Sequence, residues 1–157
     1  MWSAATVLVC ALELLGRSPA TFPPIRLIDA PPRDATPSVE AFVRPGDDTI
    51  SVVTSSAPFR DARSAPHRCG DNDALRKIAS IIVHEEWHVR HGPDEREAYL
   101  AQLTALATMG AGAGTRVYGV VTRSMQTVVA ADVTTRRLGP YRLELTSRTG
   151  RLRSGPP

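Results

Sequence analysis

The residues with the clearest chemical potential are His84-Glu85-Glu86-Trp87-His88, an H-E-x-x-H motif. The two histidines are four residues apart, so on a helix their imidazoles lie on one face, one turn apart. This spacing lets both bind a single zinc ion, with Glu85 beside the position left open for water. The motif therefore predicts a Zn²⁺ site in which His84 and His88 are ligands and Glu85 is the catalytic residue.

A catalytic zinc ion takes three ligands from the protein, and the motif supplies only two. His91 is excluded by geometry, because on one helix it lies about 10 Å along the axis from His84. The helix is expected to end at Gly92-Pro93, since glycine favours the residue after a helix and proline cannot continue one. The third ligand is therefore expected from the next segment of the chain.

That segment begins a second expected helix, from Asp94 to Met109, with three acidic residues in its first turn. Asp94 and Glu97 form an N-cap and N3 pair of the capping-box type, which assigns Glu97 a structural role. Glu95 lies on the helix face that it shares with Ala98, whose small side chain lets the two helices approach closely. We therefore predict Glu95 as the third ligand, ahead of Glu97 and then Asp94.

The first helix, residues 74–91, is amphipathic. A stripe that includes Leu75, Ile78 and Ile82 faces the expected core, while His84 and His88 lie near the opposite side. Asp71 or Asp73 is expected to cap its N-terminus. The helix is therefore expected to use one face for packing and the other for the site.

The H-E-x-x-H motif followed by Glu95-Arg96-Glu97-Ala98-Tyr99 resembles the gluzincin metallopeptidases, in particular the integral-membrane and minimal gluzincins. The resemblance covers about residues 47–109, and Tyr99 stands where that family has an aspartate. It implies a glutamate ligand on the second helix. It also implies an edge strand ahead of the catalytic helix, to which the substrate backbone adds. Thr49–Thr54 is similar to that strand in position and character.

The rest of the chain predicts a small α+β domain over residues 1–131, with a short sheet packed on the motif helix. Strands are expected at Ile25–Ile28, Glu40–Arg44 and Thr49–Thr54, where β-branched residues are bounded by turn formers. Residues 59–72 are expected to form a loop. Residues 115–131 favour a third helix, although their β-branching leaves a strand open. The arginine-rich tail, 132–157, is expected to be poorly ordered.

Residues 1–16 are interpreted as a first helix or, alternatively, a signal-like segment. The apolar run at 4–12 is shorter than the roughly 18 residues of a membrane span, and no basic residue precedes it. Cys10 and Cys69 could pair in an oxidising compartment, but one such pair does not decide the compartment. Localisation and oligomeric state stay open.

The composition is that of one globular domain: 157 residues, 42% hydrophobic and 22% charged. The net charge is +3, and Lys77 is the single lysine. Because no basic block with interleaved aromatic residues precedes the C-terminus, we expect no nucleic-acid partner.

The leading functional prediction is a zinc-dependent metallopeptidase, which hydrolyses peptide bonds by Glu-assisted attack of a zinc-bound water. Its partner is a peptide or protein substrate, bound along Thr49–Thr54 if the resemblance holds. One alternative is a catalytically silent zinc-binding domain with a structural or regulatory role. Another is an interaction module without metal whose basic tail binds an acidic partner. Glu85 favours the enzyme over the silent domain, since a structural zinc site does not need it.

Overall fold

The fold is α+β in this computed structural model, which describes residues 1–70 and 72–138, the last seven by their backbone alone. Within that part of the chain, five α-helices and a 3₁₀ turn accompany a three-stranded sheet. In chain order the elements are α1 (Ala4–Leu14), η1 (Pro19–Thr21), β1 (Ile25–Ile28), β2 (Ala41–Phe42), β3 (Ile50–Val53), α2 (Ala57–Ser64), α3 (Asp73–His91), α4 (Glu95–Thr108) and α5 (Arg116–Leu138).

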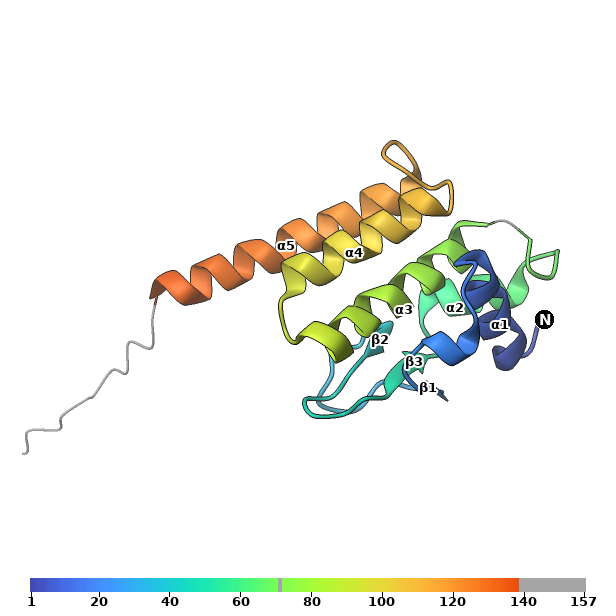
Figure 1. The fold of residues 1–157 in the computed structure, drawn as a ribbon, viewed down its shortest axis with the longest axis horizontal. Coiled ribbons are helices and arrows are strands. Elements are labelled where there is room, and N and C mark those ends of the chain that lie inside the picture. Colours follow the sequence, from blue (N-terminus) through green and yellow to red (C-terminus); the bar gives the residue numbers. More distant parts are fainter. Residues whose placement is uncertain (71, 139–157) are drawn as a thin grey trace, which may run out of the picture.

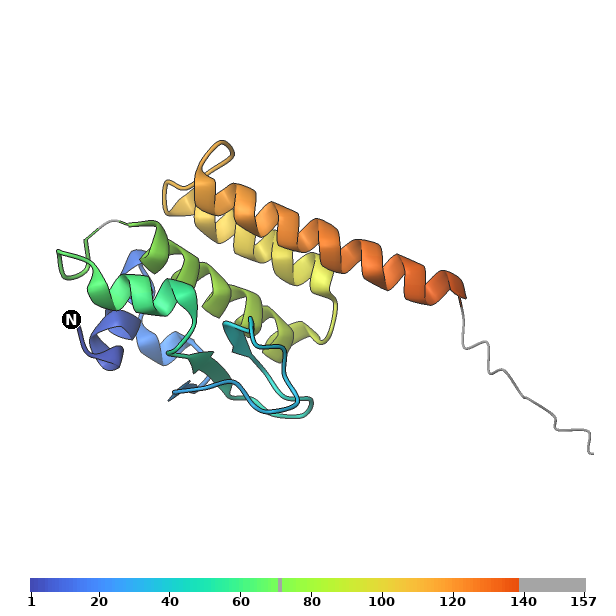
Figure 2. The same ribbon diagram turned by 180° about the vertical axis from the view of Figure 1, so that it is seen from behind.

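Helix α3 runs through the middle of the molecule, between two layers. The sheet, α1 and α2 lie on one side of it, and the antiparallel pair α4 and α5 lies on the other (Figures 1 and 2). The main core joins α1, α2, β3 and α3, and a smaller apolar cluster lies between α4 and α5. Because α3 is covered on both sides, the face that it turns away from the main core is also partly enclosed. That face can therefore help to build a site.

The sheet corrects one prediction directly. Its strand order is β1-β3-β2, with β3 parallel to β1 and antiparallel to β2. The segment Thr49–Thr54 does contain a strand, but β3 is the central strand and all four of its residues are buried. The expectation that it forms the open edge was wrong. A continuous run of β-branched residues is typical of a strand covered on both faces, and the edge next to α3 is formed by β2 instead.

Helix α3 matches its expected bounds, but its N-cap differs. The side chain of Asn72 accepts a hydrogen bond from the Leu75 amide at 2.9 Å. Asp71 or Asp73 was expected in that role, and three successive candidate side chains cannot be separated by residue type alone. The predicted apolar stripe is confirmed, with Leu75, Ile78 and Ile82 all buried.

Residues 59–72 do not form a continuous loop, because α2 occupies the first half of that segment. Pro58 lies in the first turn of α2, where its fixed φ suits a helix start and no amide is lost. Phe59 and Ala62 then point together into the core, and Phe59 is completely buried.

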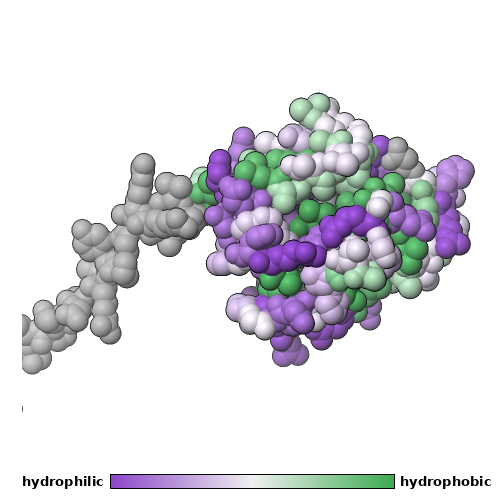
Figure 3. Space-filling model, in the orientation of Figure 1, coloured by the Kyte–Doolittle hydropathy of each residue, from purple (hydrophilic) through white to green (hydrophobic). Residues whose placement is uncertain are grey.

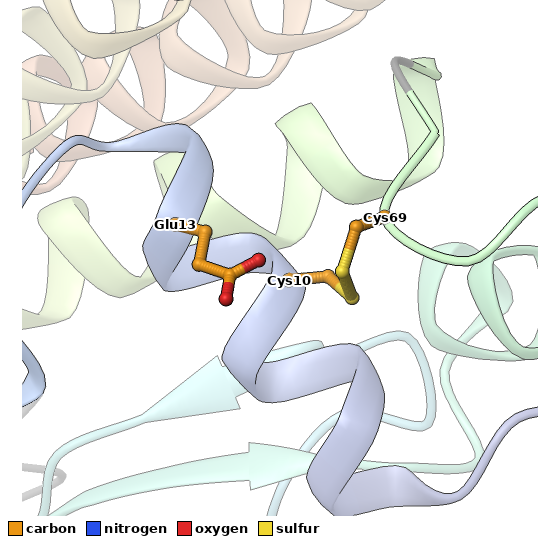
Figure 4. Close-up of side chains that lie close together, drawn as sticks. All are labelled: Cys10, Glu13 and Cys69. Carbon is orange, nitrogen blue, oxygen red and sulfur yellow. A yellow bond between two sulfur atoms is a disulfide. The ribbon is translucent and has the colours of Figure 1, made fainter.

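Helix α1 is confirmed as a helix, and it is packed into the main core. Its residues Val7, Cys10 and Leu12 are buried. Cys10 forms a disulfide with Cys69, which ties α1 to the segment ahead of α3 (Figure 4). Glu13 lies beside this pair, but both sulfur atoms are used in the covalent bond, so the three residues do not form a thiolate metal site.

The expected third helix is confirmed as α5, which follows a glycine-rich turn after α4. Its C-terminal part projects past the body of the molecule (Figure 1). The helix was expected over residues 115–131, and it continues past them to Leu138. The remainder of the predicted tail, 139–157, lies outside the described residues. None of the helices in the described part of the chain has the length and apolar character needed to cross a membrane.

Candidate metal centre

The site is built on the reversal of the chain between α3 and α4. Gly92 ends α3 with φ 99° and ψ −159°, a conformation that favours glycine. Asp94 then caps α4 by accepting a hydrogen bond from the Glu97 amide at 3.2 Å. As a result Glu95, the first residue of α4, is turned back toward the histidines of α3.

The capping box is confirmed in one direction only. Asp94 caps the helix as expected, but the Glu97 carboxylate accepts a hydrogen bond from the neighbouring Arg96 at 2.9 Å. Glu97 was expected to reach back to the Asp94 amide. The Glu97 carboxylate therefore lies on the exposed surface of α4 and is not part of the cluster formed by the two histidines and Glu95.

Three side chains that could bind a metal converge between the helices. His84 Nε2 and His88 Nε2 are 3.1 Å apart, and Glu95 places Oε2 at 3.3 Å from the first and Oε1 at 3.5 Å from the second. Ligands held about 2.0–2.1 Å from a tetrahedral zinc ion are separated by about 3.3–3.4 Å. The three side chains therefore already have the spacing that a shared zinc ion requires.

The second nitrogens of the two imidazoles have different surroundings. His88 Nδ1 lies 2.8 Å from the carbonyl oxygen of Gly92, to which it donates, and this places its Nε2 toward the cluster. His84 Nδ1 is buried and has no hydrogen-bond partner among the described residues. The ring of His84 instead packs edge-on against Tyr99, with ring centres 4.5 Å apart.

The electrostatics of the cluster favour a charged carboxylate. Hydrogen bonds from His84 and then His88 lower the pKa of Glu95 to about 2. The same interaction raises the pKa of His88, chiefly through its hydrogen bond to Glu95. Glu95 is therefore ionised across the physiological range, as a metal ligand must be.

Glu85 lies next to this cluster and is only 8% exposed. Burial raises the pKa of Glu85, while the nearby His84 and His88 and a backbone hydrogen bond at Val43 oppose the rise. A buried carboxylate with a raised pKa is suited to take up a proton and release it again. The environment of Glu85 is therefore suited to proton transfer, and Glu85 lies outside the group of residues that could hold a metal together.

The cluster lies in a groove with two halves, which share Val39, Ala41, His84 and Glu85. The first, here called the β2 half, has a volume of about 790 Å³ and lies between residues 41–48 and the junction of α3 and α4. The second, the α5 half, has about 530 Å³ and lies between residues 36–41 and helices α3, α4 and α5. The candidate site therefore lies where the two halves adjoin, with His88 and Glu95 lining only the β2 half.

Other residues singled out from the sequence lie outside the donor cluster. His91 is exposed and stacks on Trp87, with ring centres 4.9 Å apart, so its exclusion as a ligand agrees with the structure. Glu86, inside the motif, is buried and paired with Arg17 at 2.6 Å and with Arg90 at 2.7 Å, so its carboxylate is directed away from the donor cluster. Tyr99 lines the α5 half, whereas His91 lines neither half.

Sequence reasoning missed part of the groove wall. The α5 residues that line it were expected only as a helix, with no link to the site. Strand β2 has two residues, so it offers no periodicity that would have identified it as the edge beside Glu85.

In comparisons with known proteins, no family model, no curated protein and no solved structure matches this chain. The resemblance to gluzincins therefore rests on the residues of α3 and α4 alone.

Proposed function

We propose that this chain is a zinc-dependent metallopeptidase that cleaves internal bonds of extended peptides. His84, His88 and Glu95 are its zinc ligands, and Glu85 is its general base. The observation that carries the proposal is the convergence of His84, His88 and Glu95, whose ligand atoms all lie within 4.8 Å of one another beside the buried Glu85.

The donor set fits zinc in type as well as spacing. Two imidazoles and one carboxylate are a ligand set of catalytic zinc, and they leave a fourth position open. When bound, zinc supplies a Lewis acid that lowers the pKa of water toward neutrality and polarises a carbonyl group.

The chain's own residues then carry the proton transfers. A Glu85 carboxylate oxygen accepts a proton from the attacking water and returns it to the nitrogen of the departing amine. Burial raises the pKa of Glu85 and the neighbouring histidines oppose that rise, which supports both directions of transfer. Tyr99 lines the groove, and burial raises the pKa of its hydroxyl, so it stays protonated and can donate a hydrogen bond to the developing oxyanion.

The substrate backbone is proposed to add to β2 and not to Thr49–Thr54. Strand β3 is paired on both sides, so its backbone groups are already used. Strand β2 is at the edge of the sheet, and Ala41 lines both halves of the groove. Addition of an extended peptide to an edge strand provides main-chain hydrogen bonds without sequence restriction.

The length of the groove favours internal cleavage. Its wall on α3 extends from Lys77 to the end of the helix at Gly92, which is about 22 Å at 1.5 Å per residue. An extended peptide of about six or seven residues covers this length. Because Glu85 lies within the groove and not at its end, substrate residues are bound on both sides of the cleaved bond.

The test is cleavage of a library of unstructured peptides by the zinc-loaded protein, followed by mass spectrometry. We expect the wild type to cut peptides internally, and Glu85→Gln to keep its zinc but lose cleavage by about 100-fold or more. Glu13→Gln, an exposed position on α1, is the matched control and should cleave normally. If the zinc-loaded wild type cuts no peptide, the silent zinc-binding domain replaces the enzyme as the account of this site.

A further inference from the structure

We propose that the α5 half of the groove is a subsite for a bulky, uncharged side chain of the substrate, with Ser124 as its specificity-determining residue. This inference rests on the proposed peptidase function. It adds a substrate class and a role for α5 that the H-E-x-x-H and E-x-x-A segments do not contain.

The first observation is that α5 presents two different faces. Val117 and Val121 are buried against α4. Four other residues follow one another at i, i+4, i+7 and i+8 and line the groove: Val120, Ser124, Thr127 and Val128. Val120 is 36% exposed and does not belong to the α4–α5 apolar cluster. This second face is therefore free to contact a ligand.

The second observation is the position of this face relative to the chemistry. The α5 half contains His84 and Glu85 as part of its own lining, so a side chain bound there belongs to a residue next to the cleaved bond. Its volume of about 530 Å³ lies within the roughly 300–1,000 Å³ of small-molecule sites. A bulky side chain therefore fits without displacement of the walls.

The third observation concerns charge. Apart from His84 and Glu85, the charged residues that line this half are Glu40 and Lys77, and they form an ion pair of 3.0 Å. Both partners are largely shielded from solvent, with side-chain exposures of 29% and 14%. Since these charges already compensate each other, a charged substrate side chain would lose its hydration without gaining a free partner.

The uncharged part of the lining suits an apolar or amide side chain. Val39, Ile81, Val120 and Val128 provide apolar surface. The hydroxyl of Ser124 donates to the Val120 carbonyl within its own helix at 3.3 Å, so it does not bridge the groove. Ser124 is small and lies between Val120 and Val128 on this face, which makes it the position where added bulk would fill the subsite.

The experiment compares two peptide sets that differ at one residue next to the scissile bond, one carrying Phe or Leu and the other Gly or Ala. We expect the wild type to favour the bulky set. Ser124→Trp should lower that preference in kcat/KM by about tenfold or more while its zinc content stays at one per chain. Gln126→Trp, an exposed α5 position outside this half of the groove, is the matched control and should keep the preference.

A second variant tests the charge argument without added bulk. Lys77→Met leaves Glu40 without its partner, so peptides with Arg at the same residue should gain about tenfold in kcat/KM relative to wild type. The subsite is overturned if Ser124→Trp keeps the wild-type preference, or if the wild type accepts Arg or Asp as well as Phe. Absence of all cleavage by the zinc-loaded wild type would instead remove the proposed function itself.

Discussion

At the scale of single residues, the candidate ligands are held together by interactions among themselves. Glu95 lies within 3.5 Å of both histidine Nε2 atoms, and His88 is oriented from behind by the Gly92 carbonyl. A carboxylate between two imidazoles attracts a proton when metal is absent, which is why the pKa of His88 is raised and that of Glu95 is lowered. Zinc bound by the proposed ligands would therefore have to replace a proton, so we expect its affinity to depend on pH.

The pH dependence of the metal-free protein follows from these shifts. The pKa of His88 is raised above 6.5, so its contribution to stability is present below that pH and is lost as the pH rises through the folded-state value. The pKa of Glu95 is lowered from 4.5 to about 2, so its contribution is present above 4.5 and is lost as the pH falls toward 2. The interaction between His88 and Glu95 therefore stabilises the metal-free protein most between about pH 4.5 and pH 6.5.

Near pH 6.5, zinc binding should displace a proton from His88, because only neutral His88 can act as a ligand. Toward about pH 8, the number of protons released should be smaller, because less of His88 is protonated. Calorimetric titration with zinc in buffers of different ionisation enthalpy measures this release directly. His67→Ala, which changes an exposed histidine outside the site, is the control and should titrate as the wild type does. A zinc affinity that is the same at about pH 5.5 and about pH 8 would contradict this account of the cluster.

At the scale of elements, the junction between α3 and α4 determines whether Glu95 can meet the histidines. Gly92 has a positive φ, and a Cβ atom there would meet no other atom within 4 Å. The constraint on this position is therefore backbone conformation and not space. The Gly92 carbonyl is also the acceptor for His88 Nδ1, so the same residue serves both the turn and the ligand.

Gly92→Ala should therefore reduce the free energy of unfolding by about 1–3 kcal/mol, since alanine is strained at this φ and ψ. Zinc affinity should also fall by about tenfold, because the carbonyl that orients His88 shifts with the turn. Chemical denaturation and zinc titration measure the two effects. Gly112→Ala, at a glycine with no positive φ and open surroundings, is the control. Equal stability of the two variants would show that the turn is not constrained as described.

The α3–α4 junction could be predicted from the sequence because the residues that determine it are close together in the chain. The Gly92-Pro93 break and the cap at Asp94 set the end of one helix and the start of the next. The face of α4 then separates Glu95 from Glu97. The ligand atoms of the three predicted ligands, His84, His88 and Glu95, lie within 4.8 Å of one another in the structure.

The sheet could not be predicted to the same extent, because strand order depends on contacts between distant segments. β3 was recognised from its β-branched residues, but its central place requires β1 and β2 on either side. A strand was expected over Glu40–Arg44, but β2 covers only Ala41–Phe42, and α2 begins at Ala57 within a segment that was largely expected to be a loop. The walls of the groove come from β2 with its flanking residues, from α3 and α4, and from α5. Local patterns therefore indicated the candidate site but not the groove around it.

At the scale of the whole molecule, α3 links the stabilising core to the site. Its core-facing residues run from Leu75 to Val89, and its C-terminal half also carries the candidate ligands His84 and His88. The space-filling view shows hydrophobic and hydrophilic residues interspersed over the visible face (Figure 3). One helix thus serves both the core and the candidate site.

The disulfide should stabilise the fold without affecting the ligands. Cys10 and Cys69 are separated by 59 residues, and closing a loop of that size in the unfolded chain corresponds to about 4 kcal/mol. Reducing agent should therefore lower the free energy of unfolding by about this amount while the folded fraction still binds zinc. The double variant Cys10→Ser with Cys69→Ser is the control and should not respond to reductant. An unchanged denaturation midpoint for the wild type in reductant would be the contrary result.

The central claim is that His84, His88 and Glu95 bind one zinc ion together, and the most direct test is the zinc content of matched variants after reconstitution and dialysis. We predict one zinc per chain for the wild type and for Glu97→Ala, which should cost about 1 kcal/mol or less in stability. His88→Ala and Glu95→Ala should keep none under the same conditions. A wild type that emerges without zinc, or a Glu95→Ala protein that holds zinc as well as Glu97→Ala does, would contradict the account.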